Sequence, residues 1–177
     1  LSNPYFALTK FSDFEIAIRV LYEGVNVKSN ETPWHYLVKW IGLTIPLAAL
    51  LGFLGSLVLA PRLLKRYQPL WIGLVFFAAV FPVFYVIYKK SNVYAGWRQL
   101  TFVYPPLAVA AALFWNELLN IFSGKKIVQY ATYAGFALLL TDAAAFIAFN
   151  PKIPYVYFNP LAGGVQGAYG KYETDYW

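Results

Sequence analysis

The chain has 177 residues, of which 60% are hydrophobic, 20% aromatic and only 12% charged, and its mean hydropathy is +0.52. A soluble domain carries about 25% charged residues, so this composition excludes a disordered chain, a disulfide-stabilised mini-protein and an ordinary soluble enzyme. It indicates a membrane protein. The formal charge of +6 does not indicate a nucleic-acid partner, because the basic residues lie between apolar segments and form no basic block.

Two residue types are absent from the sequence, which contains no cysteine and no methionine. Without cysteine the chain has no disulfide, no thiolate nucleophile and no cysteine metal site. Its one histidine, His35, does not form a metal centre alone. We therefore predict neither a metal nor a cofactor. Because a native reading frame starts with methionine, we expect this chain to be processed or to be a segment of a longer protein.

Four long apolar segments separate the charged residues. About 20 apolar residues, rising about 1.5 Å each, cross a hydrocarbon layer of about 30 Å. The segments therefore predict four transmembrane helices, at about 40–61, 67–88, 99–117 and 127–150. The predicted fold class is an all-α membrane protein. It comprises an outer-face segment with a possible interfacial helix (1–38), a four-helix transmembrane bundle (39–151) and a second outer-face segment (152–177).

Small residues recur at four-residue spacing along the first predicted helix, at Ala48, Gly52 and Ser56. Such a stripe lets helices approach closely. We therefore expect the helices to pack as a bundle or against helices of a partner. Proline also lies in this segment, at Pro46, where it kinks or breaks a helix.

The basic residues of the short connections predict how the helices cross the membrane. The first and third connections carry five of them: Arg62, Lys65, Arg66, Lys125 and Lys126. By the positive-inside rule both connections are expected on the cytoplasmic side. The N-terminal and C-terminal segments then lie on the outer, periplasmic side, although the outer loop between the second and third helices also carries basic residues.

Two candidate binding residues lie near the outer ends of the helices. Arg98 follows Trp97 at the outer end of the third helix. There a guanidinium can bind a phosphate bidentately and flanking aromatic rings can cover a sugar or a prenyl chain; the alternative is a snorkelling arginine that anchors the helix end. His35 follows Trp34 just outside the first helix. It is a candidate general base, phosphate contact or pigment ligand, against the alternative of a hydrogen-bonded residue of the aromatic interface.

Two acidic residues fall in or beside the predicted helices. Asp142 lies within the fourth helix, and a carboxylate inside a membrane is costly and indicates a functional site. It either faces the bundle and pairs with Arg98 or with a hydroxyl, or is protonated and merely hydrogen-bonded. Glu117 lies at the cytoplasmic end of the third helix, where we expect a solvated helix-end charge.

Three stretches together carry a family resemblance. They are PWHYLVKWIGLTIP (33–46), GWRQLTFVYPP (96–106), and YVYFNPLAGG (155–164) with the Gly-Ala-Tyr and Asp-Tyr-Trp that follow it. In order and spacing they resemble the later membrane half of bacterial dolichyl-phosphate-mannose–protein mannosyltransferase-like proteins, which are GT-C type glycosyltransferases. The resemblance covers the chain from about Phe11 to Trp177.

The resemblance implies a multi-pass enzyme of the bacterial inner membrane that takes a sugar from a polyprenyl-phosphate donor on the periplasmic face. Arg98 matches the Trp-Arg position at which donor phosphate contact is expected, and Tyr104 belongs to the same motif. His35 matches the Trp-His-Tyr position in an outer loop, while Gln99 departs from the histidine expected in many relatives. The family's acidic residues for acceptor activation lie in an earlier outer loop with which nothing here aligns. We therefore predict no catalytic residue and no transfer by this chain alone.

Two functions follow from these observations. In the first, the chain is the C-terminal membrane segment of a polyprenyl-phosphate-sugar-dependent glycosyltransferase. In the second, it is a non-catalytic subunit of a larger respiratory, photosynthetic or secretion complex, derived from such a transferase. The expected partners are membrane lipids, the polyprenyl-phosphate sugar if the protein is enzymatic, and either the missing N-terminal half or other membrane subunits, but no nucleic acid.

Overall fold

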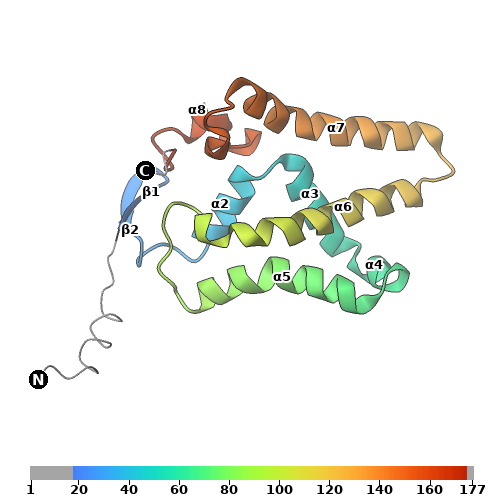
Figure 1. The fold of residues 1–177 in the computed structure, drawn as a ribbon, viewed down its shortest axis with the longest axis horizontal. Helices are drawn as coiled ribbons and strands as arrows, with labels where there is room; N and C mark the ends of the chain where they lie inside the picture. The colour runs from blue at the N-terminus through green and yellow to red at the C-terminus, as the bar shows by residue number, and fades with distance from the viewer. Residues whose placement is uncertain (1–17, 175–177) are drawn as a thin grey trace, which may run out of the picture.

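The structure is a computed structural model that describes residues 18–174 (Figure 1). These residues are mostly helical, with one small antiparallel sheet. Three helices are long and apolar enough to cross a membrane: α5 (Pro69–Tyr88), α6 (Tyr104–Ile121, preceded by the 3-10 helix η1, Arg98–Val103) and α7 (Lys126–Phe149). They correspond to the second, third and fourth helices predicted from the sequence, and identify a multi-pass membrane protein.

The first predicted helix, over 40–61, is not continuous. It is divided into α2 (Tyr36–Thr44), α3 (Leu47–Val58) and α4 (Ala60–Arg66). Proline disfavours the helical conformation in the residue before it, and Ile45 is accordingly extended, with φ −97° and ψ 152°. Helix α4 then bends by 77° from α3, and only as a bent pair do these two helices meet the length of a membrane span.

The described part of the segment predicted as an interfacial helix is a β-hairpin instead. Strands β1 (Arg19–Tyr22) and β2 (Val25–Lys28) are antiparallel, with Tyr22 opposite Val25. The two residues between them, Glu23 and Gly24, have φ of 54° and 82°. Positive φ at both positions is the type I′ turn that matches the twist of a hairpin. The rest of that prediction, and the last motif residues, lie outside the described residues.

Helix α3 packs along α6, and α5 lies against α6 and α4 (Figure 1). The predicted stripe of small residues makes the first contact possible, since Ala48, Gly52 and Ser56 are all buried. A Cβ atom at Gly52 would lie 2.7 Å from the Cβ atom of Ala111 on α6. Trp115 of α6 also donates its indole N–H to the Ala48 carbonyl oxygen at 2.9 Å. The expected close packing of this stripe is confirmed.

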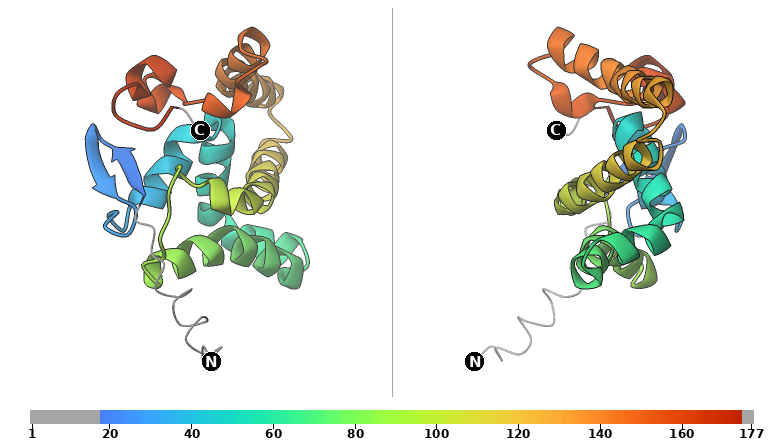
Figure 2. Two further views of the ribbon diagram at one scale, coloured as in Figure 1. Left: turned by 60° about the vertical axis from the view of Figure 1, so that its left-hand side comes forward. Right: turned by 90° about the vertical axis from the view of Figure 1, so that its right-hand side faces the viewer.

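The long helices separate two ends of different character (Figures 1 and 2). The aromatic end holds the hairpin, α2, the loop 89–97, η1 and the C-terminal segment 150–174 with η2 (Pro154–Val156), η3 (Pro160–Ala162) and α8 (Gly164–Ala168). Its buried core includes Tyr22, Tyr36, Trp40, Phe158 and Tyr172. The cationic end, opposite, holds α4 and the α6–α7 turn, with Arg62, Lys65, Arg66, Lys125 and Lys126.

Candidate functional site

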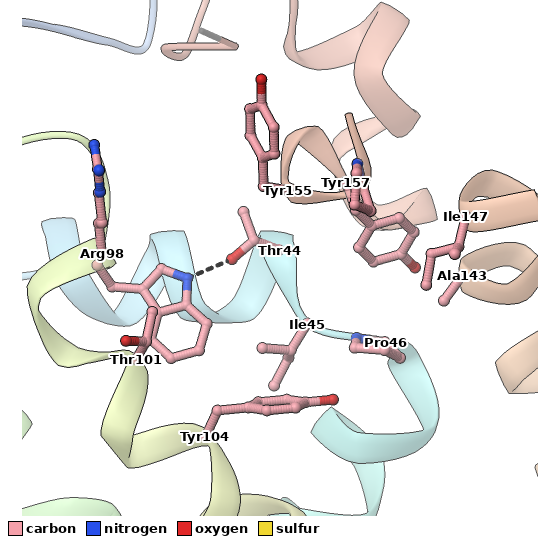
Figure 3. A pocket seen from close by; sticks show the side chains of 12 residues that line it. Thr44, Ile45, Pro46, Arg98, Thr101, Tyr104, Ala143, Ile147, Tyr155 and Tyr157 are labelled. Atoms are coloured by element: carbon pink, nitrogen blue, oxygen red, sulfur yellow. Dashed lines mark hydrogen bonds between the residues drawn. The ribbon is translucent and has the colours of Figure 1, made fainter. Parts of the chain in front are cut away.

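A cavity of about 560 Å³ lies at the aromatic end, where the α2–α3 break, η1, α6, α7 and the segment after α7 meet (Figure 3). Most of its lining is apolar or aromatic. One cationic side chain, Arg98, is among the described residues that line it, and none of these residues is acidic or a histidine. Two of the residues predicted from the sequence, Trp97 and Tyr104, line the same cavity.

The loop before η1 positions Arg98 by packing against α2. Gly96 has φ of 67° and lies against the Trp40 ring, where an added Cβ atom would be 2.9 Å from Cε3. Its N–H donates to the Tyr36 hydroxyl at 3.1 Å. Trp97 then donates its indole N–H to the Thr44 hydroxyl at 2.7 Å. The backbone at Gly96 and the ring of Trp97 are therefore fixed, and Arg98 begins η1 with an exposed side chain.

The next turn of the chain, at the start of α6, forms the base of the cavity. Tyr104 begins α6, and its ring contacts Trp97 edge to face with centroids 6.2 Å apart. In Figure 3, Tyr104 lies at the base of the cavity beneath Ile45, while Arg98 and Tyr155 extend away from it. The cavity thus has an aromatic base and a guanidinium at its opening, an arrangement that fits a molecule with one apolar part and one anionic part.

The opposite wall joins α7 to the segment that follows it. Ala143 and Ile147 of α7 line the cavity beside Tyr157 (Figure 3). The Tyr157 hydroxyl donates to Oδ2 of Asp142 at 2.7 Å. Burial raises the pKa of Tyr157, and the hydrogen bond to Asp142 and the charge of that carboxylate raise it further. Of the partners predicted for Asp142, the structure shows a hydroxyl, and no ion pair joins its carboxylate to Arg98.

The other two predicted site residues lie outside this cavity. His35 precedes α2, with its ring 6.0 Å from that of Tyr22 and 5.5 Å from that of Trp34. Trp34 is 74% exposed and lines a second cavity of about 310 Å³ together with Glu31 and Lys90. Arg98, Trp97 and Tyr104 therefore line one cavity. Asp142 does not line it but binds Tyr157, which does. His35 and Trp34 lie at a separate surface.

Glu117 differs from the sequence-based expectation of a solvated helix end. It is fully buried, and Arg62 donates its Nε–H to Oε1 at 2.5 Å. Nη1 of Arg66 lies 3.1 Å from Oε2, in an ion pair without hydrogen-bond alignment. The bend between α3 and α4 brings these arginines over α6. The four-residue spacing of Arg62 and Arg66, which places both on one helix face, is the sequence signal for this cluster.

The chemistry of the described cavity is that of binding rather than of proton transfer. Arginine binds phosphate through paired N–H groups, while the apolar walls match a hydrocarbon chain. Within residues 18–174 no group of three histidine, cysteine or acidic residues is placed to hold a metal ion. No protein-family model, curated protein or solved structure matches the chain.

Proposed function

We propose that the chain forms the donor-binding part of a membrane glycosyltransferase that takes its sugar from a polyprenyl phosphate. The observation that carries this proposal is the position of Arg98 at the opening of a largely apolar cavity with an aromatic base. A polyprenyl-phosphate sugar has the matching parts, because it joins a hydrocarbon chain, one phosphate and one sugar. The family resemblance of the 96–106 and 155–164 stretches supports the same assignment.

The cavity contributes binding and leaving-group stabilisation in this proposal. An acceptor oxygen attacks the anomeric carbon of the sugar, the bond from that carbon to the phosphate oxygen breaks, and the polyprenyl phosphate leaves with the bonding electrons. Arg98 holds the phosphate and stabilises its growing charge. A carboxylate outside the described residues accepts the acceptor proton. The chain is accordingly one part of the enzyme, and does not transfer sugar alone.

The same proposal includes a membrane orientation. The aromatic end faces the periplasm of a bacterial inner membrane, and the cationic end faces the cytoplasm. Two short connections at the cationic end carry five basic residues, against the three of the single short connection at the aromatic end (Lys89, Lys90 and Arg98), and the positive-inside rule, which counts short connections, therefore supports this orientation. Trp34 and Tyr94, exposed at the other end, suit the opposite interface, where aromatic residues gather.

One observation favours the second candidate function, a non-catalytic subunit of a larger membrane complex. In the most apolar 18-residue stretch of α7 only 6% of the residues are buried, against 28% in the corresponding stretch of η1 and α6. Helix α7 is therefore available for contact with further helices as well as with lipid. A subunit of that kind needs no phosphate site, so ligand binding at Arg98 separates the two candidates.

The test measures binding of a polyprenyl monophosphate to the purified chain in detergent micelles, with the corresponding polyprenol as the uncharged comparison. Replacing Arg98 by glutamine removes a charge-assisted contact of about 1.5–3 kcal/mol, so we expect affinity for the phosphate to fall about 10- to 100-fold. Arg19→Gln is the matched control, because Arg19 is an exposed arginine on β1 that does not line the cavity. Equal affinity of wild type and Arg98→Gln, or equal binding of phosphate and alcohol, contradicts the proposal.

A further inference from the structure

The cationic end carries an excess of positive charge that the protein itself does not neutralise. Among the described residues there, five are basic (Arg62, Lys65, Arg66, Lys125 and Lys126), and one, Glu117, is acidic. The end is held together by α6. Glu117 binds both arginines of α4, Asn116 donates to the Tyr67 hydroxyl at 2.9 Å, and Gln129 at the start of α7 donates to the Leu119 carbonyl oxygen at 3.4 Å.

Glu117 uses only part of the donor capacity of its two partners. A guanidinium has five N–H groups, and the ion pairs involve Nε of Arg62 and one terminal nitrogen of Arg66. The two arginine side chains remain 55% and 45% exposed, whereas that of Glu117 is 0% exposed. The carboxylate therefore fixes the direction of both guanidiniums and leaves their remaining N–H groups at the surface of α4.

Large apolar and aromatic side chains lie immediately beside these cations. Leu70 and Trp71, in the first turn of α5, are 62% and 61% exposed. Ile127 and Tyr130, in the first two turns of α7, are 85% and 70% exposed. Cations beside exposed tryptophan and tyrosine are the pattern of the headgroup level of a bilayer. A soluble acidic partner would leave these apolar side chains in water.

We propose that the cationic end is a binding surface for the phosphate headgroups of anionic phospholipids. Helix α4, turned 77° from α3, lies along the bilayer surface instead of crossing it. The three lysines and the two arginines that Glu117 orients bind the headgroup phosphates together, so the lysines supply three of the five positive charges of the surface. Trp71 and Ile127 enter the adjoining acyl region. This surface is at the opposite end from the Arg98 cavity, and its function is independent of sugar transfer.

The test titrates the detergent-solubilised chain with phosphatidylglycerol and phosphatidylcholine of the same acyl composition and measures bound lipid by native mass spectrometry. The test variant is Lys65→Gln/Lys125→Gln/Lys126→Gln, which keeps the Glu117 ion pairs and hence the fold of this end. The control is Lys89→Gln/Lys152→Gln/Lys171→Gln, which has the same net charge and changes exposed lysines at the aromatic end. Circular dichroism verifies the helix content of both variants.

A basic residue near an anionic surface strengthens binding about fivefold. We therefore expect the wild-type chain to prefer phosphatidylglycerol at least tenfold, the test variant to lose at least tenfold of that preference, and the control to stay within about twofold of wild type. A wild-type chain without preference, or a test variant that keeps it, overturns the proposal. An equal loss in both variants also overturns it, because net charge rather than this surface would then be responsible.

Discussion

The two ends of the molecule are built on different interactions. The interior of the aromatic end is closed mainly by neutral hydrogen bonds and ring contacts, and Asn159 donates to the carbonyl oxygens of Gly42 and Ile45 at 2.7 and 2.9 Å. Two ion pairs of this end, Lys39 with Glu23 and Lys28 with Glu31, lie at the surface. The cationic end depends on one buried carboxylate between two half-exposed arginines. The two ends therefore present their positive charges in different ways. Neutral contacts surround the cavity that Arg98 lines, whereas at the other end a single acid binds two arginines.

The largest expected effect tests the cationic end. Arg62→Gln/Arg66→Gln leaves Glu117 buried without a counter-charge, which destabilises a protein by about 3 kcal/mol or more. Glu117→Gln instead leaves two arginines that reach water, so its loss should be much smaller. Unfolding in mixed micelles, followed by circular dichroism, measures both. Equal losses of stability in the two variants would contradict the argument that the buried carboxylate is the group that needs a counter-charge.

The aromatic end should respond most to Asn159. This side chain is 0% exposed, accepts from the Leu161 N–H at 3.0 Å and connects the C-terminal segment to the α2–α3 break. Asn159→Leu leaves the Gly42 and Ile45 carbonyl oxygens without this donor, at about 2 kcal/mol in total. We expect the free energy of unfolding to fall by that amount and polyprenyl-phosphate affinity to fall with it. Asn120→Leu at the cationic end is the comparison, expected to leave the affinity unchanged.

Much of the fold was predictable from the sequence, because the length of apolar segments with few charges is enough to identify α5, α6 and α7. The proximity of Arg98, Trp97 and Tyr104 was also predictable, because these residues are close in sequence, whereas their role in donor binding stays a prediction. The hairpin was missed because the Glu23-Gly24 turn was read within a mixed apolar pattern. For Asp142 the sequence left the partner open between Arg98 and a hydroxyl, because the choice depends on the rotation of α7. The ion pairs of Glu117 were missed because they depend on the bend before α4, which a hydropathy pattern does not contain.

Alkaline pH should destabilise the protein through Tyr22 of the aromatic end. Burial, and then the neighbouring Tyr172, raises the pKa of Tyr22 to about 12 from 10.0. Between these values the unfolded chain loses the Tyr22 proton and the folded chain keeps it, so the free energy of unfolding falls as pH rises. Tyr22→Phe removes this contribution, and the Tyr22 hydroxyl has no hydrogen-bond partner among the described residues. From pH 9 to 12 the free energy of unfolding of the wild type should therefore fall more than that of Tyr22→Phe.

The smallest effect concerns the wall that α7 shares with the cavity. Tyr157→Phe keeps the ring against Phe146, 5.6 Å between centroids, and removes only the hydroxyl that donates to Asp142. We expect a loss of about 1.5 kcal/mol in the free energy of unfolding, the lower end of the range for a hydrogen bond to a charged group. Asp142→Asn keeps an acceptor oxygen for that hydroxyl while removing the charge, so it separates hydrogen bonding from electrostatics. If Asp142→Asn reproduces the full effect of Tyr157→Phe, the negative charge rather than the shared proton holds α7 to the C-terminal segment. If it retains wild-type stability, the hydrogen bond is sufficient, and the negative charge of Asp142 is not needed to hold α7 to the C-terminal segment.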